Sequence, residues 1–198
     1  NLLIMFVIAS YLTVVLLVYF SQSRLIYYPM QKISNTPDAI GLDYTPVNIA
    51  TTDGETLHGW WVPAPDAKGT VLFFHGNAGN ISHRINYLAM FKRLGYDTLL
   101  FDYRGYGQSS GVPSESGTYL DAQAVWHYLT ATQGIAPAQI VLFGESLGGA
   151  VAAWLAAREK PGLLALASAF TSFPDMAAEI YPFLPVLWLA RFNYNTLE

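Results

Sequence analysis

The chain has 198 residues, of which 53% are apolar and 12% are charged, and its formal net charge at pH 7 is −4. Lys and Arg do not cluster beyond a pair, so the chain lacks the basic surface that nucleic-acid binding requires, and we expect no nucleic-acid partner. Cysteine is absent, which excludes thiolate metal sites, and the four histidines lack the spacing of a helical metal site. We expect neither a metal nor a cofactor.

Residues 2–20, "LLIMFVIASYLTVVLLVYF", form an apolar stretch without a charged side chain. A helix over these residues would span roughly 28 Å, close to the ~30 Å hydrocarbon core of a bilayer. A cleaved signal peptide and a buried core helix are alternatives, but no A-x-A-like site follows and no polar stripe is present. We predict a transmembrane anchor over residues 1–23, hence a single-pass membrane protein, and leave open which side of the membrane carries the rest.

The remainder of the chain divides into a connector and one domain. Residues 24–42 contain Pro29, Pro37 and Gly41, which predict an irregular connector. No linker interrupts residues 43–198, so we predict a single domain there. It begins with two short strands, over 44–50 and 55–62, joined by "TDGE", in which Asp-Gly supplies the positive φ of a hairpin turn.

Continuous apolar strands then alternate with helices. The expected strands lie in "GTVLFFHG", "DTLLFDYRGYG", "AQIVLFG" and "LLALASAF", and the expected helices cover residues 81–94, 114–134 and 147–160. This alternation predicts a parallel sheet covered by helices on both faces, because buried parallel strands are apolar throughout.

Ser146 lies in the sequence Gly-Glu-Ser-Leu-Gly, between an expected strand and an expected helix. The G-x-S-x-G pattern is weak alone, but this position is what a nucleophile elbow requires. Side chains at Gly144 and Gly148 would collide with neighbouring backbone in so sharp a turn, and the serine backbone would be strained. The alternative is a glycine-rich turn in which the serine caps the helix.

A second motif, "HGNAGN" at residues 75–80, ends an earlier strand. There the backbone N–H groups of Asn77 and Leu147 are predicted to converge on a carbonyl oxygen that becomes negative. A phosphate-binding loop is the alternative, but the Gly-Lys-Ser/Thr ending of a P-loop is missing.

With "HGNAGN", "DYRGYGQSSG" and "GESLGG" in this order, the chain resembles the alpha/beta-hydrolase superfamily, and most closely its membrane-anchored serine hydrolases. The resemblance covers nearly all of the chain after the anchor. It implies an α/β fold with a mostly parallel sheet whose first strands are antiparallel. It also implies Ser146 as nucleophile, with Asn77 and Leu147 as oxyanion-hole donors.

The same resemblance assigns three further residues to structure. Asp102 and Arg104, in "FDYRGYG", match a family motif that organises a loop. His75 precedes the serine, whereas the catalytic histidine of this fold comes last in the chain.

The catalytic acid and base of this fold follow the serine in the order Asp or Glu, then His. No histidine follows Ser146, and the acidic residues after it are Glu159, Asp175, Glu179 and Glu198. The chain also begins without methionine. We therefore expect a truncated sequence that lacks the last part of the domain. It would contain neither the catalytic acid nor the catalytic histidine, and it would be inactive alone. Asp175, after the sixth strand, is the alternative acid.

Residues 172–192, "SFPDMAAEIYPFLPVLWLARF", are apolar and aromatic and contain three prolines. The resemblance implies a lid or cap over the active site, whose natural guest is an apolar acyl group. An ordinary amphipathic helix packed on the sheet is the alternative.

These features predict a serine hydrolase acting on carboxylic esters or thioesters, with a small-molecule or lipid acyl ester as substrate. A peptidase of the prolyl-oligopeptidase or aminopeptidase type is one alternative. A non-catalytic binding protein with the same fold is another, and the oligomeric state stays open.

Overall fold

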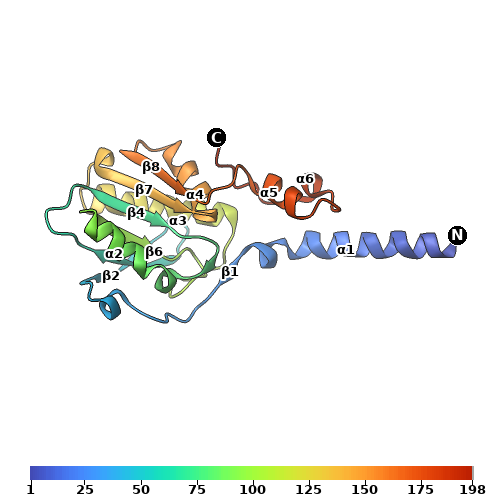
Figure 1. Ribbon diagram of the computed structural model, residues 1–198, viewed down its shortest axis with the longest axis horizontal. Coiled ribbons are helices and arrows are strands. Elements are labelled where there is room, and N and C mark those ends of the chain that lie inside the picture. Colours follow the sequence, from blue (N-terminus) through green and yellow to red (C-terminus); the bar gives the residue numbers. More distant parts are fainter. Residues whose placement is uncertain (198) are drawn as a thin grey trace.

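A six-stranded sheet in the order β2-β3-β6-β4-β7-β8 organises the fold of residues 1–197, which the computed structural model describes (Figure 1). The strands are β2 (Thr45–Ala50), β3 (Thr56–Val62), β4 (Thr70–Phe74), β6 (Asp97–Phe101), β7 (Ile140–Glu145) and β8 (Leu163–Ala167). β3 pairs antiparallel with β2 and β6, whereas β6, β4, β7 and β8 run parallel. The predicted mostly parallel sheet with antiparallel first strands is confirmed.

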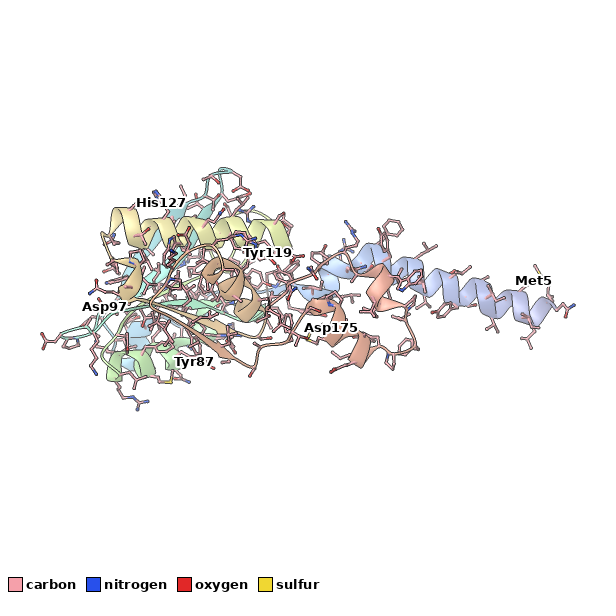
Figure 2. All side chains as sticks on the ribbon, turned by 90° about the horizontal axis from the view of Figure 1, so that it is seen from above. Met5, Tyr87, Asp97, Tyr119, His127 and Asp175 are labelled. Atoms are coloured by element: carbon pink, nitrogen blue, oxygen red, sulfur yellow. The ribbon has the colours of Figure 1, made fainter. Side chains whose placement is uncertain are left out.

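Helices cover both faces of this sheet, as the alternating pattern indicates. Figure 2 shows α2 (Ile85–Arg93, with Tyr87 labelled) on one side and α3 (Glu115–His127, with Tyr119 and His127 labelled) on the other. α4 (Leu147–Ala156) packs beside α3. Successive residues of β4 alternate between two apolar cores, Leu72 and Phe74 in one and Val71 and Phe73 in the other. A strand buried on both faces has to be apolar throughout.

A long helix, α1 (Leu2–Ile26), projects from the domain (Figure 1). It has 25 residues, and its most apolar 18-residue stretch has a mean hydropathy of 2.6, so by length and composition it could cross a membrane. The helix continues to Ile26, beyond the boundary at residue 23 that the sequence predicts. Part of the connector is also ordered, because β1 (Tyr28–Pro29) pairs in parallel with β5 (Ala78–Gly79).

Two short helices, α5 (Phe173–Ile180) and α6 (Val186–Leu189), lie alongside the half of α1 nearer the domain (Figure 1). Asp97, at the start of β6, is at the end of the domain away from α1, whereas Asp175 of α5 lies next to α1 (Figure 2). The carboxyl ends of the parallel strands therefore face α1, α5 and α6.

Candidate active site

The turn between β7 and α4 places Ser146 in a strained conformation. Its φ is 52° and its ψ is −118°, outside the regions that residues with a Cβ normally adopt. A Cβ on Gly144 would lie 2.5 Å from the Cα of Gly149, and one on Gly148 would lie 2.1 Å from the carbonyl oxygen of Phe74. Only glycine fits at either position, for the steric reason that the sequence predicts.

The Ser146 side chain does not cap the helix that follows it. The serine is half-buried, its backbone N–H donates to the carbonyl of Ala167 (2.9 Å), and its carbonyl accepts from the N–H of Gly149 (2.8 Å). Its hydroxyl makes no capping hydrogen bond to α4. The helix-capping alternative is therefore wrong, and among residues 1–197 the hydroxyl, at the carboxyl edge of the sheet, has no hydrogen-bond partner.

The loop of residues 75–80 lies directly beside this serine. A Cβ on Gly76 would lie 3.5 Å from the Cβ of Ser146. Within residues 1–197, the backbone N–H groups of Asn77 and Leu147 donate to no protein acceptor. Leu147 is the first residue of α4, where an N–H has no partner inside the helix. Two N–H groups without acceptors, on the serine's own turn and on the adjacent loop, are what an oxyanion hole requires.

Asn77 is held by the segment that connects α1 to the domain. Its carbonyl accepts from the N–H of Tyr28 (3.2 Å) and from the hydroxyl of Tyr106 (2.8 Å). Its side-chain Nδ2 donates to the carbonyl of Ile26 (2.6 Å), the last residue of α1. Because the side chain of Asn77 bonds to Ile26 and its carbonyl to Tyr28, the position of Asn77 depends on the end of α1 and the residues that follow it.

An ion pair that sequence analysis did not find joins the elbow to the same loop. Glu145 directly precedes the serine, and its Oε2 lies 3.0 Å from Nε of Arg84. Arg84 also donates from Nη1 to the carbonyl of Ala78 (3.1 Å). Nothing local in the sequence links residues 84 and 145, so only the fold reveals this pair.

His75 and Asp102 form a buried pair behind the loop. Both side chains are fully buried, and Nε2 of His75 lies 3.3 Å from Oδ1 of Asp102. Nδ1 of His75 donates to the carbonyl of Gly76 (2.7 Å), and Oδ1 of Asp102 accepts from the N–H of Ile81 (2.9 Å). These bonds tie the strand ends to the loop.

Arg104 joins the β2–β3 turn to α3. Its Nε donates to Oδ1 of Asp121 (2.8 Å), and Nη1 and Nη2 donate to Asp53 (2.7 and 3.1 Å). Burial raises the pKa of Asp121 to about 6, although the hydrogen bonds from Arg104 act to lower it. The hydrogen bond from Arg104 lowers the pKa of Asp53, which is more accessible, to about 2. This network holds loops and helices together.

Asp175, the alternative acid, serves the start of α5. Its Oδ2 accepts from the hydroxyls of Ser172 (2.6 Å) and Thr171 (3.2 Å) at the helix N-terminus. None of the four histidines hydrogen-bonds Ser146 or Asp175 in the part of the chain that the structure describes. Among the described residues, no histidine therefore links Asp175 to the serine through hydrogen bonds.

Asn77 also borders a cavity of about 190 Å³ between α1 and the segment that contains α5 and α6. Apolar side chains of these helices form most of its lining. One residue of the candidate oxyanion loop thus lines an apolar space.

Comparison with known proteins places this architecture. The family model described as the alpha/beta hydrolase fold matches residues 69–192. Among solved structures, an esterase from Pyrococcus furiosus superposes with a TM-score of 0.66 at 25% identity, over 83% of this chain and 64% of that one. An alpha-beta hydrolase from Vibrio vulnificus gives a TM-score of 0.70 at 25% identity, over 84% and 64%.

Curated relatives match nearly all of this chain. An uncharacterized protein of Mycobacterium tuberculosis is 38% identical over 187 residues, covering 93% of this chain and 66% of its own length. The alpha/beta hydrolase domain-containing protein WAV2 of Arabidopsis thaliana is 40% identical, over 86% of this chain and 58% of its own. An uncharacterized membrane protein of Saccharomyces cerevisiae is 34% identical, over 84% and 61%. The chain thus spans 58% to 66% of the length of these relatives.

Proposed function

The chain belongs to the alpha/beta hydrolase family, and from that premise we propose that its full-length form is a serine hydrolase that cleaves carboxylic esters or thioesters through an acyl-enzyme on Ser146. One observation carries the proposal. Ser146 occupies a strained turn that only flanking glycines permit, and its hydroxyl is not used to cap the helix. Strain without a structural use is typical of a functional site. The esterase from Pyrococcus furiosus supports the ester class.

In the proposed reaction, Oγ of Ser146 attacks the ester carbonyl carbon and the carbonyl oxygen becomes negative. The N–H groups of Asn77 and Leu147 stabilise that charge. Collapse of the intermediate breaks the bond to the alcohol or thiol, which leaves with a proton, and water then releases the acid from the acyl-enzyme. A base has to take the serine proton. No histidine among residues 1–197 hydrogen-bonds Ser146, so the proposal requires an acid and a histidine from outside the described residues.

Replacement of the serine tests this proposal. In the full-length protein, Ser146→Ala should lower the hydrolysis of an aryl acetate by on the order of 10⁴-fold or more, because the nucleophile is lost. Ser116→Ala, at an exposed position on α3, is the matched control and should keep the native rate. Near-native turnover by Ser146→Ala would reject the mechanism, and an inactive native protein would favour a non-catalytic binding protein.

We also propose that α1 anchors the protein in a membrane. Its length and hydropathy suit a span, none of its most apolar window is buried, and a yeast relative is named as a membrane protein. The proposal leaves the side of the membrane open.

A further inference from the structure

The cavity beside Asn77 has two apolar walls. One is the half of α1 nearer the domain, which includes Val18, and the other is the 172–192 segment, which includes Ala177 and Leu189. Its volume is about 190 Å³. Asn77, a candidate oxyanion donor, belongs to the lining, whereas Ser146 and Leu147 do not. An apolar space with such a residue in its wall suits a hydrocarbon chain whose carbonyl group lies at that residue.

Polar contacts clamp the two walls together. Gln22 of α1 is 7% exposed, and both polar atoms of its amide are hydrogen-bonded: Nε2 donates to the carbonyl of Leu189 and Oε1 accepts from the N–H of Arg191, both at 2.8 Å. Farther along the helix, the hydroxyl of Tyr11 donates to the carbonyl of Phe183 (3.1 Å). A buried amide on an otherwise apolar helix is costly unless satisfied, so this bonding fixes the segment against α1.

The segment reaches well along the helix. Tyr11 and Arg24 are separated by about 20 Å of helix axis at ~1.5 Å per residue. Because Phe183 contacts Tyr11, the tip of the segment lies at the level of the apolar stretch of α1. If α1 spans a bilayer, this tip is within one leaflet.

The outer face of the segment suits such a position. Phe183, Leu187 and Trp188 are 67%, 64% and 92% exposed, and no charged residue occurs between Glu179 and Arg191. An exposed aromatic and aliphatic face of this kind is unfavourable in water and favourable against acyl chains. The exposed face and the apolar helix beside it therefore point to the same surroundings, a lipid leaflet.

We propose that the cavity between α1 and the 172–192 segment is an acyl-chain site, which takes the hydrocarbon chain of a lipid ester from the adjacent leaflet. This inference rests on the proposed serine hydrolase function and adds its substrate class. The chain lies between the anchor helix and the segment, and its carbonyl lies at Asn77, beside the Ser146 turn. The anchor helix is thus one wall of the substrate site as well as the attachment to the membrane.

The test narrows the cavity from the α1 side. Val18 lines the cavity, whereas its neighbour Leu17 is 63% exposed on the helix surface, so Val18→Phe and Leu17→Phe form a matched pair. The full-length protein is reconstituted in phosphatidylcholine vesicles and assayed with p-nitrophenyl acetate, butyrate and octanoate. In the native protein each buried methylene should raise kcat/KM by about fourfold until the cavity is filled.

Val18→Phe should lower kcat/KM for the octanoate by about tenfold or more and leave the acetate within about twofold, because only the longer chain needs the filled volume. Leu17→Phe should match the native protein with all three esters. A second pair repeats the test from the opposite wall, with Ala177→Phe in the lining and Ala178→Phe beside it. It keeps the test decisive if one of the two helices folds poorly with a phenylalanine.

The acyl-chain site would be overturned if Val18→Phe lowered kcat/KM equally for acetate and octanoate. It would also be overturned if, in both pairs, the lining variant and its control changed kcat/KM equally. The hydrolase function would stand in either case. Failure of the proposed serine hydrolase function would give a different result, namely acetate hydrolysis that survives Ser146→Ala. A native preference for the acetate over the octanoate in vesicles would also reject the leaflet as the source of substrate.

Discussion

The conformation of Ser146 follows from residues that are small rather than reactive. Gly144 lets the end of β7 approach the first turn of α4, and Gly148 lets α4 approach the end of β4, so closely that a Cβ at either position would contact backbone atoms. The turn is predictable from sequence because the five-residue G-x-S-x-G pattern indicates it, although the carbonyl that excludes a side chain at Gly148 belongs to the distant Phe74. The ion pair of Arg84 with Glu145 is not predictable in this way, because its partners are far apart in the chain and each resembles an ordinary surface charge.

Burial of Asp121 predicts a specific pH dependence of stability. Its pKa is about 6 in the folded protein, above the ordinary value of 3.8. Between these values the folded state binds more protons than the unfolded state, so this carboxyl stabilises the fold below pH 3.8 and the contribution is lost as pH rises through about 6. Asp121→Asn removes the titration.

The measurement is the Tm of the native protein and of Asp121→Asn across this pH range in detergent. The native Tm should fall relative to that of the variant as pH rises from about 4 to about 6, and the difference should then level off. A native protein that gains stability over the variant in the same interval would show that Arg104 keeps the carboxyl ionised and its pKa low.

At the scale of elements, the connector is where sequence and structure differ most. The continuous apolar runs of β4 and β7 and the Asp53-Gly54 turn, with φ of +93° at Gly54, are local signals, and the sheet and its first hairpin are predictable from them. Tyr28–Pro29 instead becomes a strand only because Ala78–Gly79 is beside it. Proline and glycine content cannot indicate a pairing between such distant segments.

The same pairing joins α1 to the candidate oxyanion loop, which yields a prediction for Asn77. Asn77→Ala removes the hydrogen bond to the Ile26 carbonyl but keeps the backbone N–H that is proposed to act. We expect about 1 kcal/mol lower stability and a fall in kcat of less than about tenfold. Asn86→Ala, on the exposed surface of α2, is the control for thermal unfolding and ester hydrolysis. A loss as large as that of Ser146→Ala would mean that the Asn77 side chain itself acts on the substrate.

At the scale of the whole molecule, one end of the sheet faces both the long helix α1 and the segment that contains α5 and α6 (Figure 1). The proposed anchor would therefore hold the carboxyl edge of the strands, where Ser146 lies, at the membrane surface. A hydrolase of soluble esters has no need of that orientation, whereas a lipid ester can reach the edge without crossing water.

Membrane fractionation tests the anchor. The native protein should remain in the pellet through carbonate and high-salt washes, because a 25-residue helix with an 18-residue stretch of mean hydropathy 2.6 inserts by apolar contact rather than by charge. Its intact mass should still include residues 1–26. Release into the supernatant would reject the anchor, and a mass that lacks the helix would identify it as a cleaved signal.

The central claim, that Ser146 is the nucleophile, is tested most directly by labelling the full-length protein with a fluorophosphonate and locating the adduct by tandem mass spectrometry. Such a probe reacts with a serine only where a base and an oxyanion hole activate it. The account predicts one adduct, on Ser146, and its disappearance in Ser146→Ala. An adduct on another residue, or ester hydrolysis that continues without any adduct, would contradict it.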